Sequence, residues 1–113
     1  MKRILLYAVV ATFLLTTFLC WKIAIAGESL QGKEIYANNC QMCHGANGTG
    51  DGPAASSFNP PPRDFTDSAF WKSNPETKIK NAVENGFGNM PSVGLEPDQT
   101  KAVINYMENA FKK

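Results

Sequence analysis

Two cysteines and a histidine lie close together in the segment Cys40-Gln41-Met42-Cys43-His44. Cys-x-x-Cys-His is the attachment sequence for c-type haem. Two thiols at this spacing add to the two vinyl groups of one haem edge as thioethers, and the next side chain then reaches the iron. His44 is the only histidine in the chain. The sequence therefore predicts one covalently bound haem c, attached through Cys40 and Cys43, with His44 as an axial iron ligand.

Other uses of these three side chains fit the sequence less well. A thioredoxin-like redox pair would accompany a βαβ pattern, which is not visible here. A structural zinc site needs four ligands, and the sequence offers no second cluster to complete one. Residues 27–113 hold only these two cysteines, whereas a small secreted domain stapled by disulfides carries four or more.

The second axial ligand is sought among the methionines, because one histidine excludes bis-histidine ligation from within the chain. Met1 lies outside the domain, and Met42, between the two cysteines, cannot reach the far face of the haem. Met107 belongs to an apolar helical stripe and is expected to pack in the core. Met90 lies in a loop with helix breakers on both sides. We predict Met90 as the second iron ligand.

Three segments together resemble the class I c-type cytochromes. Residues 32–45, with the haem motif, are similar to the opening of that family, and residues 85–91 are similar to its distal-ligand loop. Residues 102–107 resemble its carboxy-terminal helix. The resemblance covers most of residues 28–111. It implies an all-α cytochrome c fold, with three main short helices and long loops around one covalent haem, His/Met ligation and electron transfer.

The resemblance also implies an acceptor for His44. The Nδ1–H of a ligating histidine donates to a backbone carbonyl or carboxylate, which fixes the ring and its basicity. The family uses a proline carbonyl for this bond. Pro53 matches best by position, and Pro61 or Pro62 is the alternative.

Haem propionates need hydrogen-bond donors. Arg63 and Trp71 are candidates from the loop after the haem motif, and Tyr36 is a third. A solvated arginine or a packing aromatic is the alternative for each. Four phenylalanines are expected to pack against haem or core: Phe58, Phe65, Phe70 and Phe87.

The elements that position these residues are predicted as helices over residues 29–41, 75–85 and 97–111. The resemblance implies that the first and last helices cross at Gly32 and Tyr106, a small residue against an aromatic. The expected apolar faces consist of Ile35, Tyr36 and Cys40 in the first helix, Ile79, Ala82 and Val83 in the second, and Val103, Met107, Ala110 and Phe111 in the third.

Polar and breaker residues predict where the helices begin and end. Ser29 is expected to cap the first helix, and Asn74 the middle one, followed by Pro75 in its first turn. Gly86 is expected to end that helix. Residues 45–73 are rich in glycine and proline and are predicted to be a loop that walls the haem.

The amino-terminal segment is typical of an export signal. Lys2 and Arg3 form a positive start, and an apolar run follows. Residues 24–26 then give the small-x-small pattern of a cleavage site before Gly27. We expect residues 1–26 to be a signal peptide and the rest to be a monohaem domain in the periplasm.

Two alternatives for this segment stay open. The apolar run approaches the length that spans a bilayer, and Lys22 is untypical of a cleavage region, so the segment could remain as an anchor. Cys20 could carry a lipid, although Leu19 is too large for a bacterial lipobox. All three interpretations of the segment place residues 27–113 outside the cytoplasm, which agrees with the basic residues Lys2 and Arg3 at its amino-terminal end.

Composition limits the function of the exported part. The whole chain of 113 residues has net charge +1 and is 43% hydrophobic. Residues 27–113 alone are only about 33% hydrophobic, with a charge of about −2. Nothing here suggests nucleic-acid binding, and the chain is too short for a multi-domain enzyme. A small domain with so few apolar residues is expected to complete its core with a large cofactor.

These expectations combine into a function. We expect a periplasmic one-electron carrier rather than an enzyme, acting as a monomer with other cytochromes or membrane oxidoreductases as redox partners. The alternative is a haem c subunit of an oxidoreductase complex. Association with the membrane is expected only if the amino-terminal segment is retained.

Overall fold

The fold is entirely helical in the computed structural model, which describes residues 1–19, 27 and 29–113. The elements are α1 (Lys2–Asn39), α2 (Gln41–His44), the 3-10 turn η1 (Ala55–Ser57), α3 (Ser68–Lys72), α4 (Glu76–Asn85) and α5 (Pro97–Phe111). The described residues form no strand, and one isolated β-bridge joins Phe87 to Met90. The predicted all-α class is confirmed.

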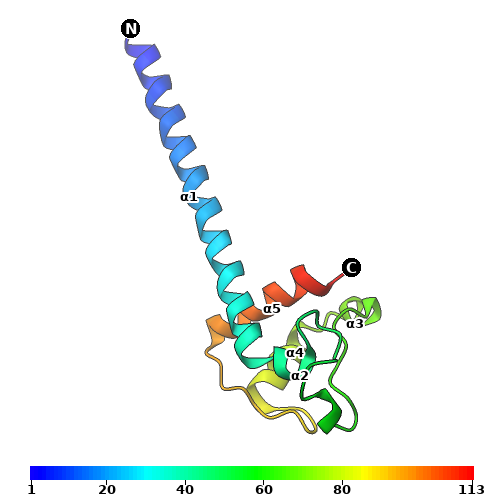
Figure 1. Ribbon diagram of the computed structural model, residues 1–113. Helices are drawn as coiled ribbons and strands as arrows, with labels where there is room; N and C mark the ends of the chain where they lie inside the picture. The colour runs from blue at the N-terminus through cyan, green and yellow to red at the C-terminus, as the bar shows by residue number, and fades with distance from the viewer.

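Helix α1 is longer than the predicted first helix (Figure 1). It begins at Lys2, so Ser29 lies inside the helix and the prediction that it caps the start was wrong. The apolar amino-terminal run contains no proline, and its backbone continues the helix of the domain. Helix α1 ends at Asn39, and Cys40 separates it from the short helix α2.

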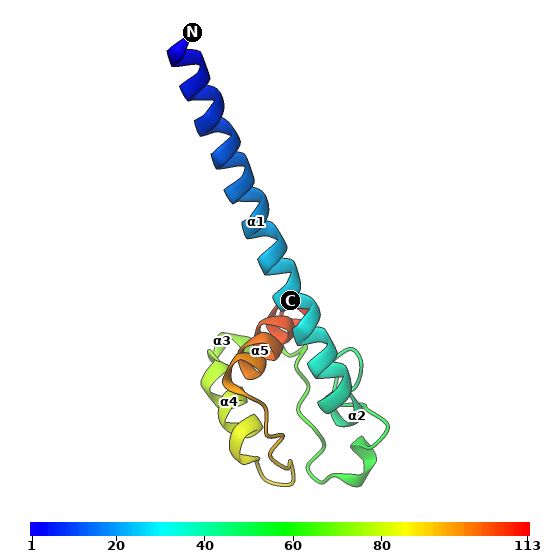
Figure 2. The same cartoon turned by 90° about the vertical axis from the view of Figure 1, so that its left-hand side faces the viewer.

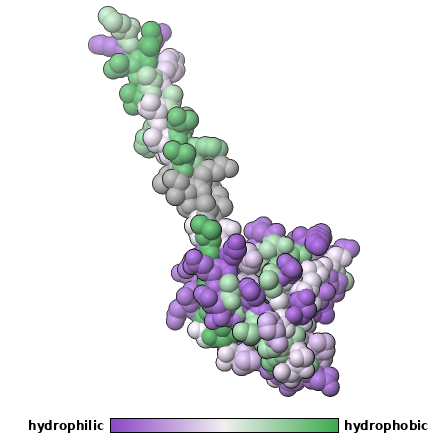
Figure 3. Space-filling view, in the orientation of Figure 1, coloured by the Kyte–Doolittle hydropathy of each residue, from purple (hydrophilic) through white to green (hydrophobic). Residues whose placement is uncertain are grey.

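The first part of α1 stands apart from the core. The window Lys2–Leu19 has no buried side chain and is long and apolar enough to cross a membrane, a test that a signal sequence also passes. Figure 3 shows apolar side chains along this part of α1, in contrast to the more polar surface of the domain. The expectations for Cys20, Lys22 and residues 24–26 lie outside the described residues.

Helices α1 and α5 cross at the predicted pair. Gly32 is buried there, and a Cβ added to it would overlap the Ala102 carbonyl and lie 2.8 Å from the Cβ of Tyr106. The Tyr36 and Tyr106 rings lie 5.6 Å apart at the same crossing. The expectation for Gly32 and Tyr106 is confirmed, and so are the bounds of α5.

The core gathers around this crossing. Its buried residues are Ile35, Tyr36, Phe65, Trp71, Ile79, Val83, Ala102, Val103, Ile104, Met107 and Phe111. Met107 is a core residue, as expected. Ala110 was wrongly included in the buried stripe, since it is exposed near the end of α5.

The middle helix starts one residue later than predicted. Pro75 precedes the helix, and its carbonyl accepts the Ile79 N–H at 2.9 Å. Asn74 has a φ of +51°, and no side-chain cap precedes α4, so its predicted capping role was wrong. Asparagine tolerates this left-handed conformation better than most residues. Gly86 ends the helix, as expected.

The segment predicted as a loop contains two short elements, η1 and α3. Asp67 caps α3, because its Oδ1 accepts the Ala69 N–H at 2.9 Å. A helix of five residues is too short to give a periodic apolar signal. Figure 2 places α2 and α4 on opposite sides of the domain.

Candidate functional site

The two thiols and the histidine lie on one helical turn. The Cys40 carbonyl accepts the N–H groups of Cys43 and His44 at 3.2 and 2.9 Å. Side chains three residues apart on a turn are neighbours, so this turn brings the two cysteines to one side. Both are partly buried free thiols. Burial, and secondly Cys43, raises the pKa of the Cys40 thiol to about 11.

His44 is buried, with 8% of its surface exposed. Its Nδ1 donates to the Arg63 carbonyl at 3.1 Å, because a carbonyl can only accept. Nε2 is then the unprotonated nitrogen, with its lone pair available to a metal. Burial lowers the pKa of His44, which the bond to Arg63 partly offsets. The neutral imidazole, which is the form able to bind a metal, is thus the favoured form.

The predicted acceptor of this bond, Pro53, was wrong, and so were its alternatives Pro61 and Pro62. Pro53 is exposed, and its neighbours pair with the backbone of the haem motif instead. Gly52 N–H donates to the Cys43 carbonyl at 3.1 Å. The chain reaches the His44 ring only when it returns at Arg63, one residue beyond the proline run.

Phe65 provides a second contact with the histidine. Its ring stacks on the His44 imidazole, with centroids 4.5 Å apart and planes inclined by 23°. The backbone N–H of Phe65 donates to the Gly48 carbonyl at 2.6 Å. Tyr36 supports the same loop, since its hydroxyl donates to the Gly45 carbonyl at 2.9 Å.

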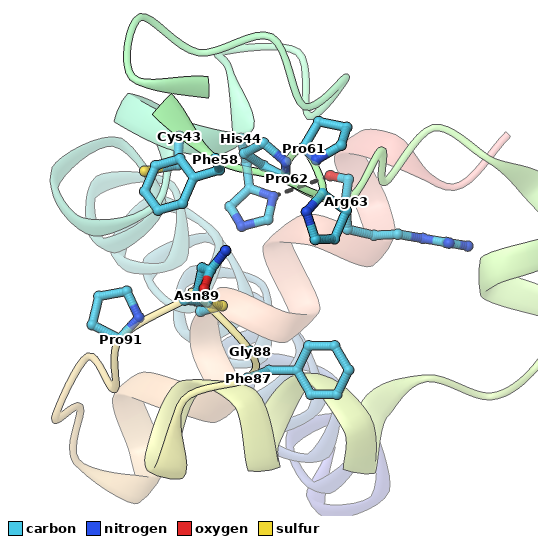
Figure 4. A pocket seen from close by; sticks show the side chains of 12 residues that line it. Cys43, His44, Phe58, Pro61, Pro62, Arg63, Phe87, Gly88, Asn89 and Pro91 are labelled. Atoms are coloured by element: carbon cyan, nitrogen blue, oxygen red, sulfur yellow. Dashed lines mark hydrogen bonds between the residues drawn. The ribbon is translucent and has the colours of Figure 1, made fainter. Parts of the chain in front are cut away.

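A cavity of about 350 Å³ opens beside His44. Three segments line it: Cys43 and His44; Phe58 and Pro60 to Arg63; and Phe87 to Pro91. Figure 4 shows His44 on one side and Gly88, Asn89 and Pro91 on the opposite side. The walls are mostly proline and aromatic carbon, which suits a flat apolar cofactor.

Met90 lines the cavity from the loop after α4. Phe87 and Met90 exchange two backbone hydrogen bonds of 3.0 and 2.9 Å, which close a tight turn. Gly86, with a φ of +79°, lets the chain leave α4 toward this turn. Met107 is in the core and is not among the residues that line the cavity. The fold therefore brings His44 and Met90 to one cavity from two distant segments.

One contact across the cavity was missed by sequence reasoning. The side-chain amide of Asn89 donates to the Asn59 carbonyl at 2.9 Å. It joins the Met90 turn to the segment that enters the proline run. Two asparagines in separate loops carry no sequence signal for such a contact, because it depends on how the loops meet.

The predicted propionate donors, Trp71 and Arg63, bind other groups of the protein. Trp71 has one N–H, which donates to the Phe65 carbonyl at 2.6 Å, and Trp71 does not line the cavity. Its predicted role was wrong for that reason. The Arg63 guanidinium pairs with Asp67 at 3.2 Å and lies over the Phe70 ring. Figure 4 shows this side chain directed away from the cavity, so Arg63 serves the site through its carbonyl.

The residues at the cavity fit a covalently bound haem. The lining offers the Cys43 thiol, an imidazole nitrogen free to bind a metal, a thioether from a second segment, and apolar walls. The second thiol, of Cys40, lies on the same helical turn as Cys43 but is not among the residues that line the cavity. No group of three His, Cys, Asp or Glu side chains in the described part of the chain is arranged to hold a metal ion by itself. This donor set is the one used for haem attachment and His/Met ligation.

Comparison with known proteins agrees with this geometry. A sequence model of the cytochrome c family matches residues 29–111. The chain is 34% identical over 80 residues to the Cbb3-type cytochrome c oxidase subunit FixP of Azorhizobium caulinodans. That match covers 68% of this chain and 25% of the relative, so the chain corresponds to about a quarter of that protein. With the motif, the helical fold and the family match in place, the chain belongs to the cytochrome c family, whose members bind haem c covalently and transfer electrons.

Proposed function

We propose that this chain is a periplasmic one-electron carrier, with haem c attached to Cys40 and Cys43 and its iron ligated by His44 and Met90. One observation carries the proposal: His44 and Met90, which come from separate segments, line the same apolar cavity. Haem c supplies one-electron exchange between Fe(III) and Fe(II) when bound. A site ligated from both sides suits electron transfer rather than substrate turnover.

The residues around the iron set how easily it is reduced. A neutral thioether from Met90 favours Fe(II) relative to a second imidazole and raises the reduction potential. The cavity walls are largely apolar, and a low dielectric disfavours the additional positive charge of Fe(III). The bond from His44 to the Arg63 carbonyl acts in the opposite direction, because it makes the imidazole more electron-donating.

Export is the second part of the proposal. Residues 1–26 act as a signal peptide that is removed before Gly27, and residues 27–113 form the periplasmic domain. The basic start and the fully exposed apolar window Lys2–Leu19 support this. Intact mass of the native protein distinguishes the cleaved domain plus one haem from a chain that keeps its amino-terminal helix as an anchor.

A second candidate function is a haem c subunit of an oxidoreductase complex. The similarity to a subunit of a cbb3-type oxidase favours it. Purification of the native protein in mild detergent separates the two functions. A free carrier elutes as a monomer, whereas a subunit elutes with an oxidoreductase and loses it only under harsher conditions.

The ligation is tested by the absorption spectrum of the oxidised protein. A weak far-red band from Met–Fe(III) is expected, and Met90→Ala should abolish it and lower the reduction potential. Met107→Leu is the matched control, because Met107 is buried in the core and should leave the band in place. A high-spin spectrum with rapid binding of small ligands in the wild type, or an unchanged band in Met90→Ala, would overturn the ligation.

A further inference from the structure

Helix α3 lies outside the cavity, yet its one buried side chain contacts the segment that holds His44. Trp71 is 7% exposed, and its Nε1–H donates to the Phe65 carbonyl at 2.6 Å. Without this hydrogen bond, the Phe65 carbonyl would lie beside the buried indole ring without the Trp71 donor. A buried hydrogen bond of this kind resists opening, because breaking it leaves two polar groups without water.

The segment that Trp71 anchors touches His44 twice. The Arg63 carbonyl accepts the Nδ1–H of His44 at 3.1 Å. The Phe65 ring stacks on the imidazole at 4.5 Å. These two contacts are separated by a single residue, so a movement of the Phe65 backbone changes both the hydrogen bond and the plane of the ring.

The other contacts between this segment and α3 or its cap do not bond the backbone of residues 63–65. The Phe65 and Phe70 rings lie 5.6 Å apart, and the Arg63 guanidinium lies over the Phe70 ring and pairs with Asp67. The ion pair of Arg63 and Asp67 is about half exposed at each side chain, at 53% and 44%. Exposed pairs contribute little and are screened by salt. The hydrogen bond from the Phe65 N–H to the Gly48 carbonyl links the segment to the loop after the haem motif and not to α3. Trp71 is therefore the buried anchor on the α3 side.

We propose that Trp71 is a positioning residue for the axial histidine: it holds the Phe65 carbonyl, and through residues 63–65 it sets the orientation and the Nδ1 hydrogen bond of His44. The inference rests on the proposed function, in which His44 ligates the iron. A looser Nδ1 bond makes the imidazole a weaker donor and stabilises Fe(III) less. Loss of the Trp71 bond should therefore shift the reduction potential upward.

The test uses Trp71→Phe in the haem-loaded protein, since phenylalanine keeps an aromatic ring and removes the N–H. Voltammetry should show a higher reduction potential than the wild type. Electron paramagnetic resonance of the oxidised protein should show changed g values, which report the orientation of the axial imidazole. The far-red band of Met90 should persist, because the opposite side of the site is unaltered.

Ile104→Val is the matched control, because it trims a buried α5 side chain that has no hydrogen-bonding group. Chemical denaturation of both variants shows how much stability each has lost. The inference holds if only Trp71→Phe shifts the potential and the g values. It is overturned if Trp71→Phe loses stability while both readouts match the wild type.

A measurement on the wild type keeps the inference testable if Trp71→Phe fails to fold. The Trp71 Nε1–H should exchange with solvent as slowly as the core amides in the reduced protein, observed by NMR. Exchange at the rate of an exposed indole would contradict a buried anchor. A wild type without the far-red band would instead contradict Met90 ligation, which separates the failure of the proposed function from the failure of this inference.

Discussion

At the residue scale, Gly86 decides how Met90 reaches the cavity. Its φ of +79° is a conformation that L side chains rarely adopt. A Cβ at this position would also lie 2.7 Å from the Met90 carbonyl oxygen and 3.2 Å from the Ser92 nitrogen. The glycine therefore permits both the sharp exit from α4 and the close return of the ligand loop.

Gly86→Ala is expected to destabilise the domain by about 1–3 kcal/mol and to weaken the far-red band of the oxidised protein. Gly94→Ala is the control, since Gly94 also has a positive φ, of +69°, but no atom lies within 4 Å of its added Cβ. The control should lose stability and keep the band. Equal effects of both variants on the band would show that backbone strain alone, and not contact with Met90, matters.

Asn89 restrains the Met90 loop through one hydrogen bond. The hydrogen bond from its side-chain amide to the Asn59 carbonyl joins the two sides of the cavity. Asn89→Ala should loosen the Met90 loop, because one exposed hydrogen bond is worth about 0.5–1.5 kcal/mol. We expect imidazole added from solution to replace Met90 several-fold faster, followed by loss of the far-red band.

The control for this variant is Asn109→Ala. Asn109 donates a bond of the same length, 2.9 Å, to the Asn105 carbonyl within α5. Its removal should leave the replacement rate unchanged. An unchanged rate in Asn89→Ala as well would mean that the contact between the loops does not restrain Met90.

At the element scale, the crossing of α1 and α5 positions the haem motif at the end of α1. The approach of the two helices leaves no room for a side chain at Gly32. Alanine normally stabilises a helix by about 1 kcal/mol relative to glycine. Here the added Cβ would meet the backbone of Ala102, so the sign should reverse.

Gly32→Ala is expected to lower the free energy of unfolding by about 1–3 kcal/mol, as overpacked cores do. Chemical denaturation of the haem-loaded protein measures it. Lys33→Ala on the same helix is the control, because Lys33 is exposed and the change should be neutral or slightly stabilising. A gain in stability for Gly32→Ala would contradict the close crossing.

The elements differ in how well their sequences predicted them. Helix α5 has fifteen residues with a clear apolar stripe, and its bounds were predicted correctly. Helix α3 was missed, although Asp67 is a recognisable cap, because one turn and a half gives no period to detect. The start of α1 was misplaced because a local capping signal at Ser29 does not compete with a helix already propagating through it.

At the scale of the whole molecule, the domain is short of apolar side chains. Residues 27–113 are only about 33% hydrophobic, and the proline and aromatic residues that line the cavity beside His44 do not belong to the buried core. A cofactor that fills this space joins the Met90 loop to the haem motif. Stability should therefore depend on haem attachment.

The double variant Cys40→Ser with Cys43→Ser should carry no covalent haem after denaturation and should be cleaved rapidly by protease. Limited proteolysis and far-ultraviolet circular dichroism measure the loss of fold. Met42→Leu lies between the two cysteines on an exposed position and should attach haem and resist protease like the wild type. A protease-resistant, helical double variant would show that the chain folds without its cofactor.

Features that depend on adjacent residues or on the helical period were predictable from the sequence. The thiol and imidazole spacing predicted haem c, and the amphipathic pattern of α5 predicted its buried face, except at Ala110. Elimination among the methionines pointed to Met90, which remains a prediction for the iron ligand.

The contacts around His44 could not be predicted from the sequence, because they depend on the three-dimensional fold. Arg63 rather than Pro53 accepts the Nδ1–H, and Trp71 binds the Phe65 carbonyl rather than a propionate. The physical reason is that these bonds depend on where a long glycine- and proline-rich segment returns to the haem motif. Every residue there has a backbone carbonyl, so residue type cannot single one out.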